Sequence, residues 1–350
     1  MLDNEFYIKI RFLLLSEFVL KIAVLGASGV VGQAMLAIVA KRLPNARVSG
    51  FASTKKNILI NNMPVKIDCI DDIDFKSFDV VLSALPANVA SEVLPQAVKE
   101  NCFVVDNSSA FRDDVRYPLV VPEVNANLVN NATRLVASPN CVAIPLSMAL
   151  KALHEKYILN VVNVSTYQAV SGAGNAAMAE LKESAQAKLE GKVAVNKNFV
   201  APIGFNVVPY IDTLEENFYT KEEMKIYNET KKIINFKDFN LNVTAVRVPV
   251  VTGHAMSVNC QFENKVTRDE AVSVLQSFKG IKVVDDFLTP LTHGVDSEVV
   301  YISRVRCDLF NDCGLNFWLV ADNILKGAAL NTVQIVEHWL QTVDILEESL

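Results

Sequence analysis

The sequence lacks the usual signs of a metal centre, a disulfide-stabilised domain or a nucleic-acid-binding surface. Its six cysteines include no Cys-x-x-Cys pair, and its four histidines are widely separated. We therefore predict no metal and no disulfide framework, which fits a reducing, cytoplasmic location. The net charge is −6 without a basic cluster, so a nucleic-acid partner is not expected. No apolar run is long enough to cross a membrane, and a membrane partner is not expected either.

The first 20 residues are apolar but do not have the pattern of a signal peptide. Lys9, Arg11 and Glu17 interrupt the apolar run, and a predicted strand follows at once. We interpret residues 1–20 as an N-terminal extension, either an edge element or the product of a start codon assigned too early. The chain of 350 residues, 51% of them hydrophobic, is sufficient for two domains.

A glycine-rich turn follows the first predicted strand. Residues 21–32, KIAVLGASGVVG, read as a buried strand, a turn and the start of a helix, with Gly26, Gly29 and Gly32 in a GxxGxxG spacing. Such a turn lets the backbone approach a pyrophosphate at a helix N-terminus, which predicts a dinucleotide site. A glycine-rich turn without a ligand is the alternative.

The next strand, residues 47–52, is followed by Ser53, Thr54, Lys55 and Lys56. An NAD site usually has an acidic residue here that binds the ribose 2′-hydroxyl. Hydroxyls and lysines favour a 2′-phosphate instead, so we predict NADP, with a solvated loop as the alternative. Apolar strands at 65–70, 80–85, 103–105 and 135–137 alternate with helical stretches, which predicts a doubly wound parallel sheet with ligands beyond its carboxyl edge.

Cys141 follows the last of these strands. Ser138, Pro139 and Asn140 are turn and capping residues, and an apolar helix is predicted to begin close to Cys141. The unsatisfied N–H groups and the positive end of the helix dipole favour a thiolate there, lowering a cysteine pKa from its free value of about 8.5. Cys141 is therefore a candidate nucleophile. A small buried structural cysteine is the alternative.

Polar side chains recur in the second half of the chain. Gln168 lies in a predicted strand, 161–169, before the flexible Ser171-Gly172 turn, although a structural glutamine is an equal alternative. Thr220 and Glu223 form a predicted capping box for a helix on which Glu222 and Lys225 share one face, an arrangement that an ordinary solvated ion pair would also explain.

Arg247 and His254 lie in a long β region, residues 241–262. Arg247 alternates with small and apolar residues, so its guanidinium is expected to be partly buried and to need an anion. His254 follows a turn at Gly253. A terminal helix from Asn323 to about Val343 is expected to pack on the first domain, which makes that domain discontinuous.

These motifs together resemble aspartate-semialdehyde dehydrogenases of the bacterial type. The resemblance covers residues 21 to about 337. It rests on the glycine turn, the segments PLVVPEVN (118–125), SPNC (138–141), TYQAVSGAG (166–174), RVPV (247–250) with Gly253-His254, and ADNILKGAALN (321–331). It implies a Rossmann-type doubly wound parallel sheet in residues 21–140 and 322–350, and an α+β catalytic and dimerisation domain in residues 141–321.

The resemblance also implies roles for individual residues. Cys141 would be the nucleophile, His254 the acid/base, and Gln168 would orient the substrate. Substrate binding would involve Arg112, Asn140, Gln168, Glu222 (amine), Lys225 (phosphate) and Arg247 (α-carboxylate). Cofactor contacts would come from Gly26, Ala27, Ser28, Gly29, Val30, Val31, Ser53, Thr54, Ser171, Gly172 and Asn323.

The implied reaction is the NADPH-dependent reductive dephosphorylation of L-4-aspartyl phosphate to L-aspartate 4-semialdehyde. It serves lysine, diaminopimelate, methionine and threonine synthesis, and the family forms homodimers or dimers of dimers. The chain departs from the family pattern at residues 53–57, at residues 84–87, and at Met256, where a glutamate is usual. The alternatives are an N-acetyl-glutamyl-phosphate reductase and a catalytically silent NADP-binding regulator.

Overall fold

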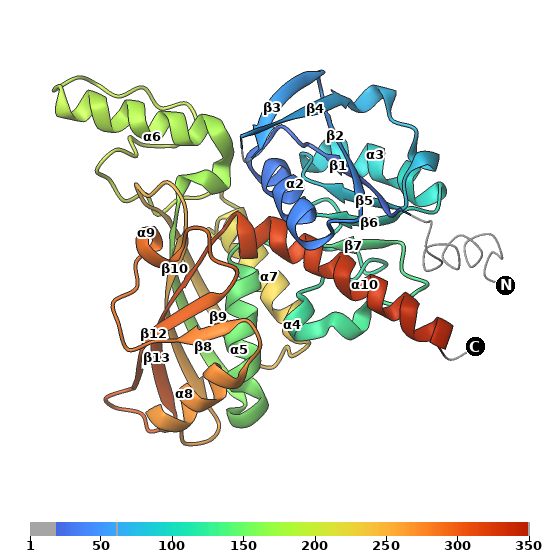
Figure 1. Ribbon diagram of the computed structural model, residues 1–350. Helices are drawn as coiled ribbons and strands as arrows, with labels where there is room; N and C mark the ends of the chain where they lie inside the picture. Colours follow the sequence, from blue (N-terminus) through green and yellow to red (C-terminus); the bar gives the residue numbers. More distant parts are fainter. Residues whose placement is uncertain (1–18, 61, 349–350) are drawn as a thin grey trace. The chain divides into compact units, whose positions relative to one another are not determined.

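Two compact units make up the part of the chain that the computed structural model describes, residues 19–60 and 62–348 (Figure 1). The first unit runs to Pro139 and resumes at Ala328, and the second unit is Asn140–Gly327. The predicted N-terminal extension lies outside the described residues, except for Val19 and Leu20.

The first unit contains a seven-stranded sheet in the order β3-β4-β2-β1-β5-β6-β7. All neighbouring strands are parallel except β3 and β4. β5 and β6 are buried at every position, as expected for parallel strands with both faces covered. The strands are β1 (Lys21–Leu25), β2 (Arg47–Ala52), β3 (Lys56–Ile60), β4 (Met63–Cys69), β5 (Val80–Ser83), β6 (Phe103–Asp106) and β7 (Leu135–Ala137).

Helices cover both faces of this sheet. Right-handed crossovers on either side of β1 place α2 (Val30–Arg42) and α3 (Ala87–Lys99) on opposite faces (Figure 1). The short helix α4 (Pro122–Asn125) and the 3₁₀ turns Ile70–Asp72, Phe75–Ser77 and Ala126–Leu128 complete the connections. The predicted doubly wound fold is therefore confirmed, apart from the antiparallel edge strand β3.

The C-terminal helix α10 (Leu330–Glu348) packs beside α2. Arg42 Nε donates to Glu337 at 2.8 Å, and the Trp339 ring stacks on Phe103 with centroids 4.3 Å apart. The prediction that this helix begins at Asn323 was wrong. Asp322 Oδ1 accepts the backbone N–H groups of Ile324 and Leu325. A π-helical turn, Leu325–Ala329, precedes α10.

The second unit contains a six-stranded mixed sheet in the order β11-β12-β13-β10-β8-β9. The pairs β8–β9 and β11–β12 are parallel, and the other neighbours are antiparallel. The strands are β8 (Leu159–Gln168), β9 (Asn240–Arg247), β10 (His254–Phe262), β11 (Ile281–Val283), β12 (Val300–Cys307) and β13 (Gly314–Ala321).

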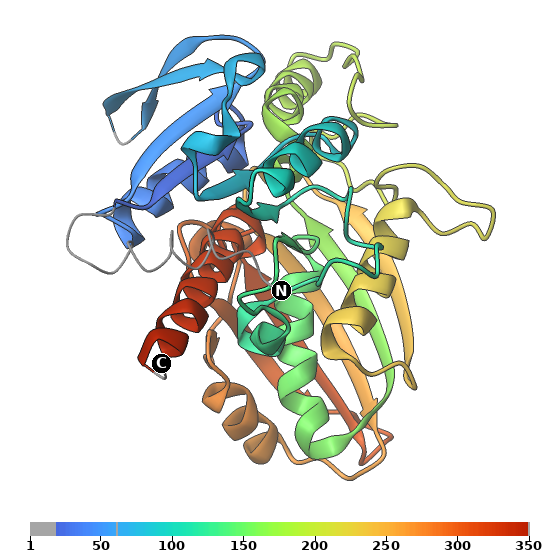
Figure 2. The ribbon, with the colours of Figure 1, turned by 90° about the vertical axis from the view of Figure 1, so that its right-hand side faces the viewer.

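Three helices, α5 (Ala143–Tyr157), α7 (Lys221–Ile234) and α8 (Arg268–Ser277), cover one face of this sheet (Figure 2). The capping box predicted at Thr220 is confirmed, because its side chain and that of Glu223 each bond the other's backbone N–H. Outside this layer are α6 (Gly174–Leu189), α9 (Pro290–His293) and the 3₁₀ turn Val170–Ala173.

The opposite face of the second sheet carries a row of asparagines in register on four adjacent strands. Asn242 donates to Asn163 at 2.9 Å, Asn163 to Asn259 at 3.3 Å, and Asn259 to Asn316 at 3.0 Å. The helix-covered face is apolar, and a smaller buried apolar cluster, Ala255, Leu288 and Val320, lies on the same face as the asparagines. In the described part of the chain no helix combines the length and apolarity needed to span a bilayer.

Candidate active site

The site of the second unit lies at one end of its sheet. Gln168 ends β8, Arg247 ends the parallel strand β9 and pairs with Gln168 in register, and His254 begins the antiparallel strand β10. Parallel and antiparallel neighbours bring these three side chains to the same end, although the chain between them makes long excursions. All three are buried, with exposed fractions of 1%, 6% and 1%.

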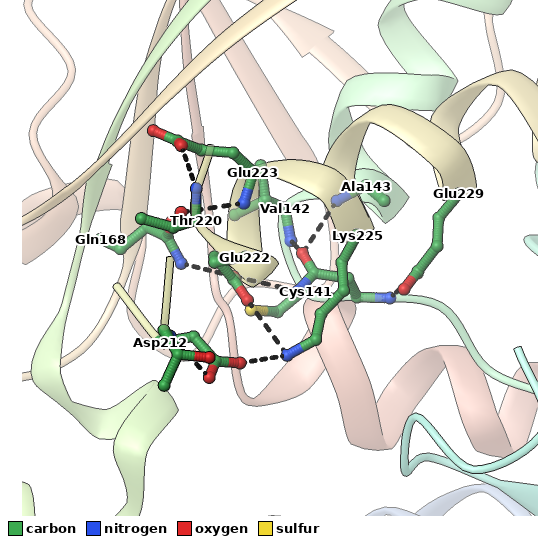
Figure 3. A network of polar contacts seen from close by, with 12 residues as sticks. Cys141, Val142, Ala143, Gln168, Asp212, Thr220, Glu222, Glu223, Lys225 and Glu229 are labelled. Carbon is green, nitrogen blue, oxygen red and sulfur yellow. Dashed lines mark hydrogen bonds and ion pairs between the residues drawn. The ribbon is translucent and has the colours of Figure 1, made fainter. Parts of the chain in front are cut away.

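Cys141 lies in the turn just before α5. Asn140 Oδ1 accepts the N–H groups of Val142, at 2.8 Å, and Ala143, at 3.4 Å, and so caps the first turn of the helix (Figure 3). The helix begins two residues after the thiol, close to the predicted position. The Cys141 sulfur is partly exposed and adjacent to the positive end of the helix dipole, which favours a thiolate.

His254 faces this sulfur. Its Nε2 lies 3.3 Å from Cys141 Sγ, and its Nδ1 accepts the backbone N–H of Ala169 at 3.0 Å. Because Nδ1 is an acceptor, the proton of the neutral ring is on Nε2 and points at the sulfur. Burial, together with the positive charge of Arg247, lowers the pKa of His254 to about 3. The ring is therefore neutral at physiological pH.

Glu222 is the centre of a buried polar network. Its Oε1 accepts hydrogen bonds from Gln168 Nε2 and from Asn140 Nδ2, both at 3.0 Å (Figure 3). Lys225 Nζ lies 3.8 Å from Glu222 Oε2 and 2.8 Å from Asp212 Oδ2. The two amide donors hold the carboxylate in place while Lys225 remains about one third exposed.

Arg247 and the 171–172 turn lie against the histidine. Burial lowers the pKa of Arg247, opposed by the negative charge of Glu222, and its Nη1 donates to Ala169 O at 2.6 Å. A Cβ added at Gly172 would lie 3.5 Å from Arg247 Nη1 and 3.6 Å from His254 Nε2. The absence of a side chain at 172 therefore keeps the space beside both groups open.

Asn323 forms hydrogen bonds to two loops of the site. Its Oδ1 accepts the N–H of Gly253 at 2.8 Å, and its Nδ2 donates to Ser171 Oγ at 3.0 Å. Gly327 lies against the nucleophile, since a Cβ added there would be 3.0 Å from Cys141 Cβ. The residue before His254 is thus held by Asn323, and Cys141 is closely packed against Gly327.

The remaining predicted residues belong to the first unit. Gly26 has φ +73°, and a Cβ there would lie 2.5 Å from Ala84 O, while one at Gly32 would lie 2.2 Å from Gly26 O. Only glycine fits this turn. It leads through Ala27, Ser28 and Gly29 into α2, which begins with Val30 and Val31 and whose N-terminus has no side-chain cap and no acidic residue in its first turn. Exposed N–H groups at a helix start suit a pyrophosphate.

The loop after β2 has an acidic neighbour that the sequence analysis missed. Lys55 Nζ forms a 2.8 Å ion pair with Asp72 Oδ2, which follows β4 rather than β2. Ser53 and Thr54 precede Lys55 and are exposed. Arg112 is buried and donates from Nη2 to Asn107 O at 2.7 Å.

The second unit thus brings together ten predicted residues: Asn140, Cys141, Gln168, Ser171, Gly172, Glu222, Lys225, Arg247, His254 and Asn323. Three groups were missed: Asp212, Glu229 and the peptide of Ala169. Only Glu229 had a sequence signal, the seven-residue spacing from Glu222 on one helix face. Among the described residues no cluster of His, Cys, Asp and Glu could hold a metal ion.

Comparison with known proteins identifies relatives over nearly the whole chain. Residues 21–132 match the family model "Semialdehyde dehydrogenase, NAD binding domain", and residues 150–326 match "Semialdehyde dehydrogenase, dimerisation domain". The aspartate-semialdehyde dehydrogenase of Rickettsia conorii is 39% identical over 91% of this chain and 96% of its own length. That of Bacillus subtilis is 37% identical over 91% and 96%.

A solved structure agrees with these relatives. The aspartate semialdehyde dehydrogenase II of Vibrio cholerae, crystallised as a complex with ASA, superposes with a TM-score of 0.88 at 34% identity. That alignment covers 92% of this chain and 98% of the Vibrio chain.

Proposed function

This chain belongs to the aspartate-semialdehyde dehydrogenase family, and on that basis we propose that it reduces L-4-aspartyl phosphate to L-aspartate 4-semialdehyde with NADPH and releases phosphate. One observation carries the proposal: Cys141 Sγ and His254 Nε2 lie 3.3 Å apart beside buried side chains of both charges. A thiolate positioned in this way is the group that acyl transfer from an acyl phosphate requires.

The proposed cycle forms and breaks one bond at the Cys141 sulfur. The thiolate attacks the acyl carbon, the bond to phosphate breaks, and the departing phosphate takes up the proton that the thiol lost. A nicotinamide dinucleotide, when bound, would supply the hydride that reduces the resulting thioester. The carbon–sulfur bond then breaks, the aldehyde leaves, and the thiolate is restored.

His254 serves this cycle as a neutral hydrogen-bond donor. Its Nε2–H faces the sulfur, where it stabilises the thiolate and is close to the oxyanion that forms on the thioester carbon. That oxyanion collapses to aldehyde and thiolate without a proton. The proposal therefore narrows the acid/base role that the family resemblance implies, because the Ala169 N–H occupies the only nitrogen that could accept a proton.

The charged side chains around Cys141 complement the three charged groups of aspartyl phosphate. We assign the α-carboxylate to Arg247, the amine to Glu222, and the phosphate to Lys225 together with Arg112. Gln168 and Asn140, which donate to Glu222, orient the substrate. A buried carboxylate at 222 has no partner in an acetylated substrate, which argues against N-acetyl-glutamyl phosphate.

The first unit fits a dinucleotide, with the glycine turn and the start of α2 holding the pyrophosphate. Gly26–Val31, Ser53 and Thr54 would make the contacts there, and Ser171, Gly172 and Asn323 would hold the nicotinamide. We propose NADP, bound through its 2′-phosphate by the hydroxyls after β2 and by Lys55 once that side chain leaves Asp72.

Membership of the family also supports proposals about the assembly, the location and the pathway of this protein. The dimerisation-domain match supports a homodimer. The cysteines of the described residues form no disulfide, which suits a cytoplasmic enzyme. The product aldehyde would supply lysine, diaminopimelate, methionine and threonine synthesis.

The testing experiment runs the reaction backwards. Purified protein is given aspartate semialdehyde, phosphate and NADP, and nicotinamide reduction is followed by absorbance. We expect turnover with wild-type protein, none with Cys141→Ala, and none with N-acetyl-glutamate semialdehyde. Turnover of the acetylated aldehyde, or full activity in Cys141→Ala, would contradict the proposal.

A further inference from the structure

A buried carboxylate outside the predicted site holds the main chain next to the nucleophile. Glu229, in the third turn of α7, is 2% exposed. Its Oε2 accepts the backbone N–H of Asn140 at 2.6 Å, across 89 residues of sequence. An N–H bond to an ionised carboxylate is shorter and stronger than a neutral one, and Figure 3 shows Glu229 reaching this N–H from α7.

This bond completes a three-point attachment of Asn140. The backbone N–H is bound by Glu229, the side-chain Nδ2 donates to Glu222 at 3.0 Å, and Oδ1 accepts the N–H of Val142 at 2.8 Å. Asn140 is the residue immediately before Cys141. Fixing both its peptide and its side chain leaves the Cys141 backbone little freedom to rotate.

One face of α7 provides two of these attachments. Glu222 and Glu229 are seven residues apart, two helical turns, so their side chains lie on the same side of the helix. The helix packs against α5, whose first turn follows the nucleophile. Helix α7 therefore binds the turn through two carboxylates, while the start of α5 binds it through Asn140 Oδ1.

We propose that Glu229 is a positioning residue for Cys141, holding the turn so that Sγ faces His254 Nε2. Glu229 acts through Asn140. Its contribution is geometric, because a displacement of about 1 Å at a nucleophile is sufficient to cost about 100-fold in rate. The inference rests on the proposed nucleophilic role of Cys141 and adds a residue to it.

The chain offers a matched control on the same helix. Glu223 is also buried, at 8% exposed, and its carboxylate also accepts backbone N–H groups, from Thr220 at 2.7 Å and Ala245 at 2.9 Å. These bonds hold the start of α7 and the edge strand β9. Replacing Glu223 therefore measures the cost of losing a buried carboxylate on α7 without releasing the nucleophile turn.

The experiment compares Glu229→Ala, Glu229→Gln and Glu223→Gln in the full chain. Three quantities are measured for each variant: the melting temperature, kcat and KM with aspartate semialdehyde, and the alkylation rate of Cys141 by iodoacetamide as a function of pH, with the modified cysteine located by mass spectrometry. The alkylation assay needs no substrate, so it tests positioning even where the proposed reaction fails.

We expect Glu229→Ala to lower kcat by about 100-fold with KM changed less than about threefold, and to alter the Cys141 alkylation profile. Glu229→Gln keeps an oxygen acceptor in the same place and should recover at least about tenfold of the lost kcat. Glu223→Gln should lower the melting temperature and leave Cys141 alkylation unchanged.

Two results would overturn the proposal. One is wild-type kcat and alkylation in Glu229→Ala. The other is an equal loss in Glu229→Gln and Glu229→Ala, which would show that the carboxylate charge matters and the acceptor does not. If Glu229→Ala does not fold, the proposal is tested by kcat and by the pH dependence of Cys141 alkylation in Glu229→Gln; wild-type values of both in Glu223→Gln with a loss in Glu229→Gln support it, and equal values in the two variants overturn it. If the wild-type protein shows no turnover but Glu229→Ala still alters the alkylation profile of Cys141, the proposed reaction is refuted and the positioning role of Glu229 stands.

Discussion

Replacing His254 with glutamine separates a hydrogen-bond donor from a proton carrier. A glutamine side chain donates an N–H but does not exchange a proton, whereas alanine does neither. His254 Nε2 lies 3.3 Å from Cys141 Sγ, and a hydrogen bond to a charged group is worth about 1.5–3 kcal/mol. His254→Ala should therefore lose about 10- to 150-fold in kcat/KM, and His254→Gln should recover a large part of that loss.

The pH profile of kcat/KM gives an independent measure of the same role. The pKa of His254 is lowered to about 3, first by burial and then by the charge of Arg247. No limb should therefore come from this ring between about pH 5 and 9. The rate should rise with pH as Cys141 ionises, and it should not fall as the pH passes the ordinary histidine value of about 6.5.

The assay is steady-state turnover of aspartate semialdehyde at saturating phosphate and NADP for wild type, His254→Ala and His254→Gln, with circular dichroism as the control for folding. Two findings together would refute the reasoning: a wild-type limb near pH 6.5 that disappears in both variants, and an equal loss of rate in glutamine and alanine. They would show that His254 carries a proton in the cycle.

Three further predictions concern His254, Arg247 and the Lys55–Asp72 ion pair. The folded-state pKa of His254 is depressed, so its contribution to stability is complete above about pH 6.5 and is lost as the pH falls towards 3. The free energy of unfolding of His254→Gln should therefore fall less in acid than that of the wild type, by up to about 3 kcal/mol at pH 4.5, as measured by urea titration. Arg247→Lys should lower kcat/KM at least about tenfold with unchanged NADP affinity, since lysine lacks the bidentate fork, and an unchanged specificity constant would remove Arg247 from the site. Asp72→Asn should raise the preference for NADP over NAD by no more than about fivefold, the range for exposed ion pairs, whereas a shift towards NAD would contradict the proposed role of Lys55.

Local patterns were sufficient to predict much of this fold. The glycine turn, the buried parallel strands and the capping box at Thr220 each depend on residues close together in sequence, and the structure confirms them. The strand containing Arg247 and the burial of its guanidinium also followed from simple alternation. Where a property depends on a few neighbouring residues, the sequence predicts it.

Contacts between distant segments were not predictable in the same way. The ion pair of Lys55 joins loops after β2 and β4, so counting residues beyond β2 could not find Asp72. The sequence of edge strand β3, KNILI, has three consecutive apolar residues and no alternation of apolar with polar residues. The start of α10 is displaced by a turn that Asp322 caps. Glu229 was missed because its partner is a backbone N–H, which every residue type except proline provides.

The peptide group of Ala169 has a consequence for how such an enzyme would be studied. Its N–H orients His254 and its carbonyl accepts a hydrogen bond from Arg247, yet its side chain is a methyl group. A saturation mutagenesis scan changes side chains only, so it would record tolerance or steric clash at position 169 and assign no role in catalysis. Replacing the amide by an ester through chemical ligation removes the N–H alone, and that atom is the one by which the histidine is oriented.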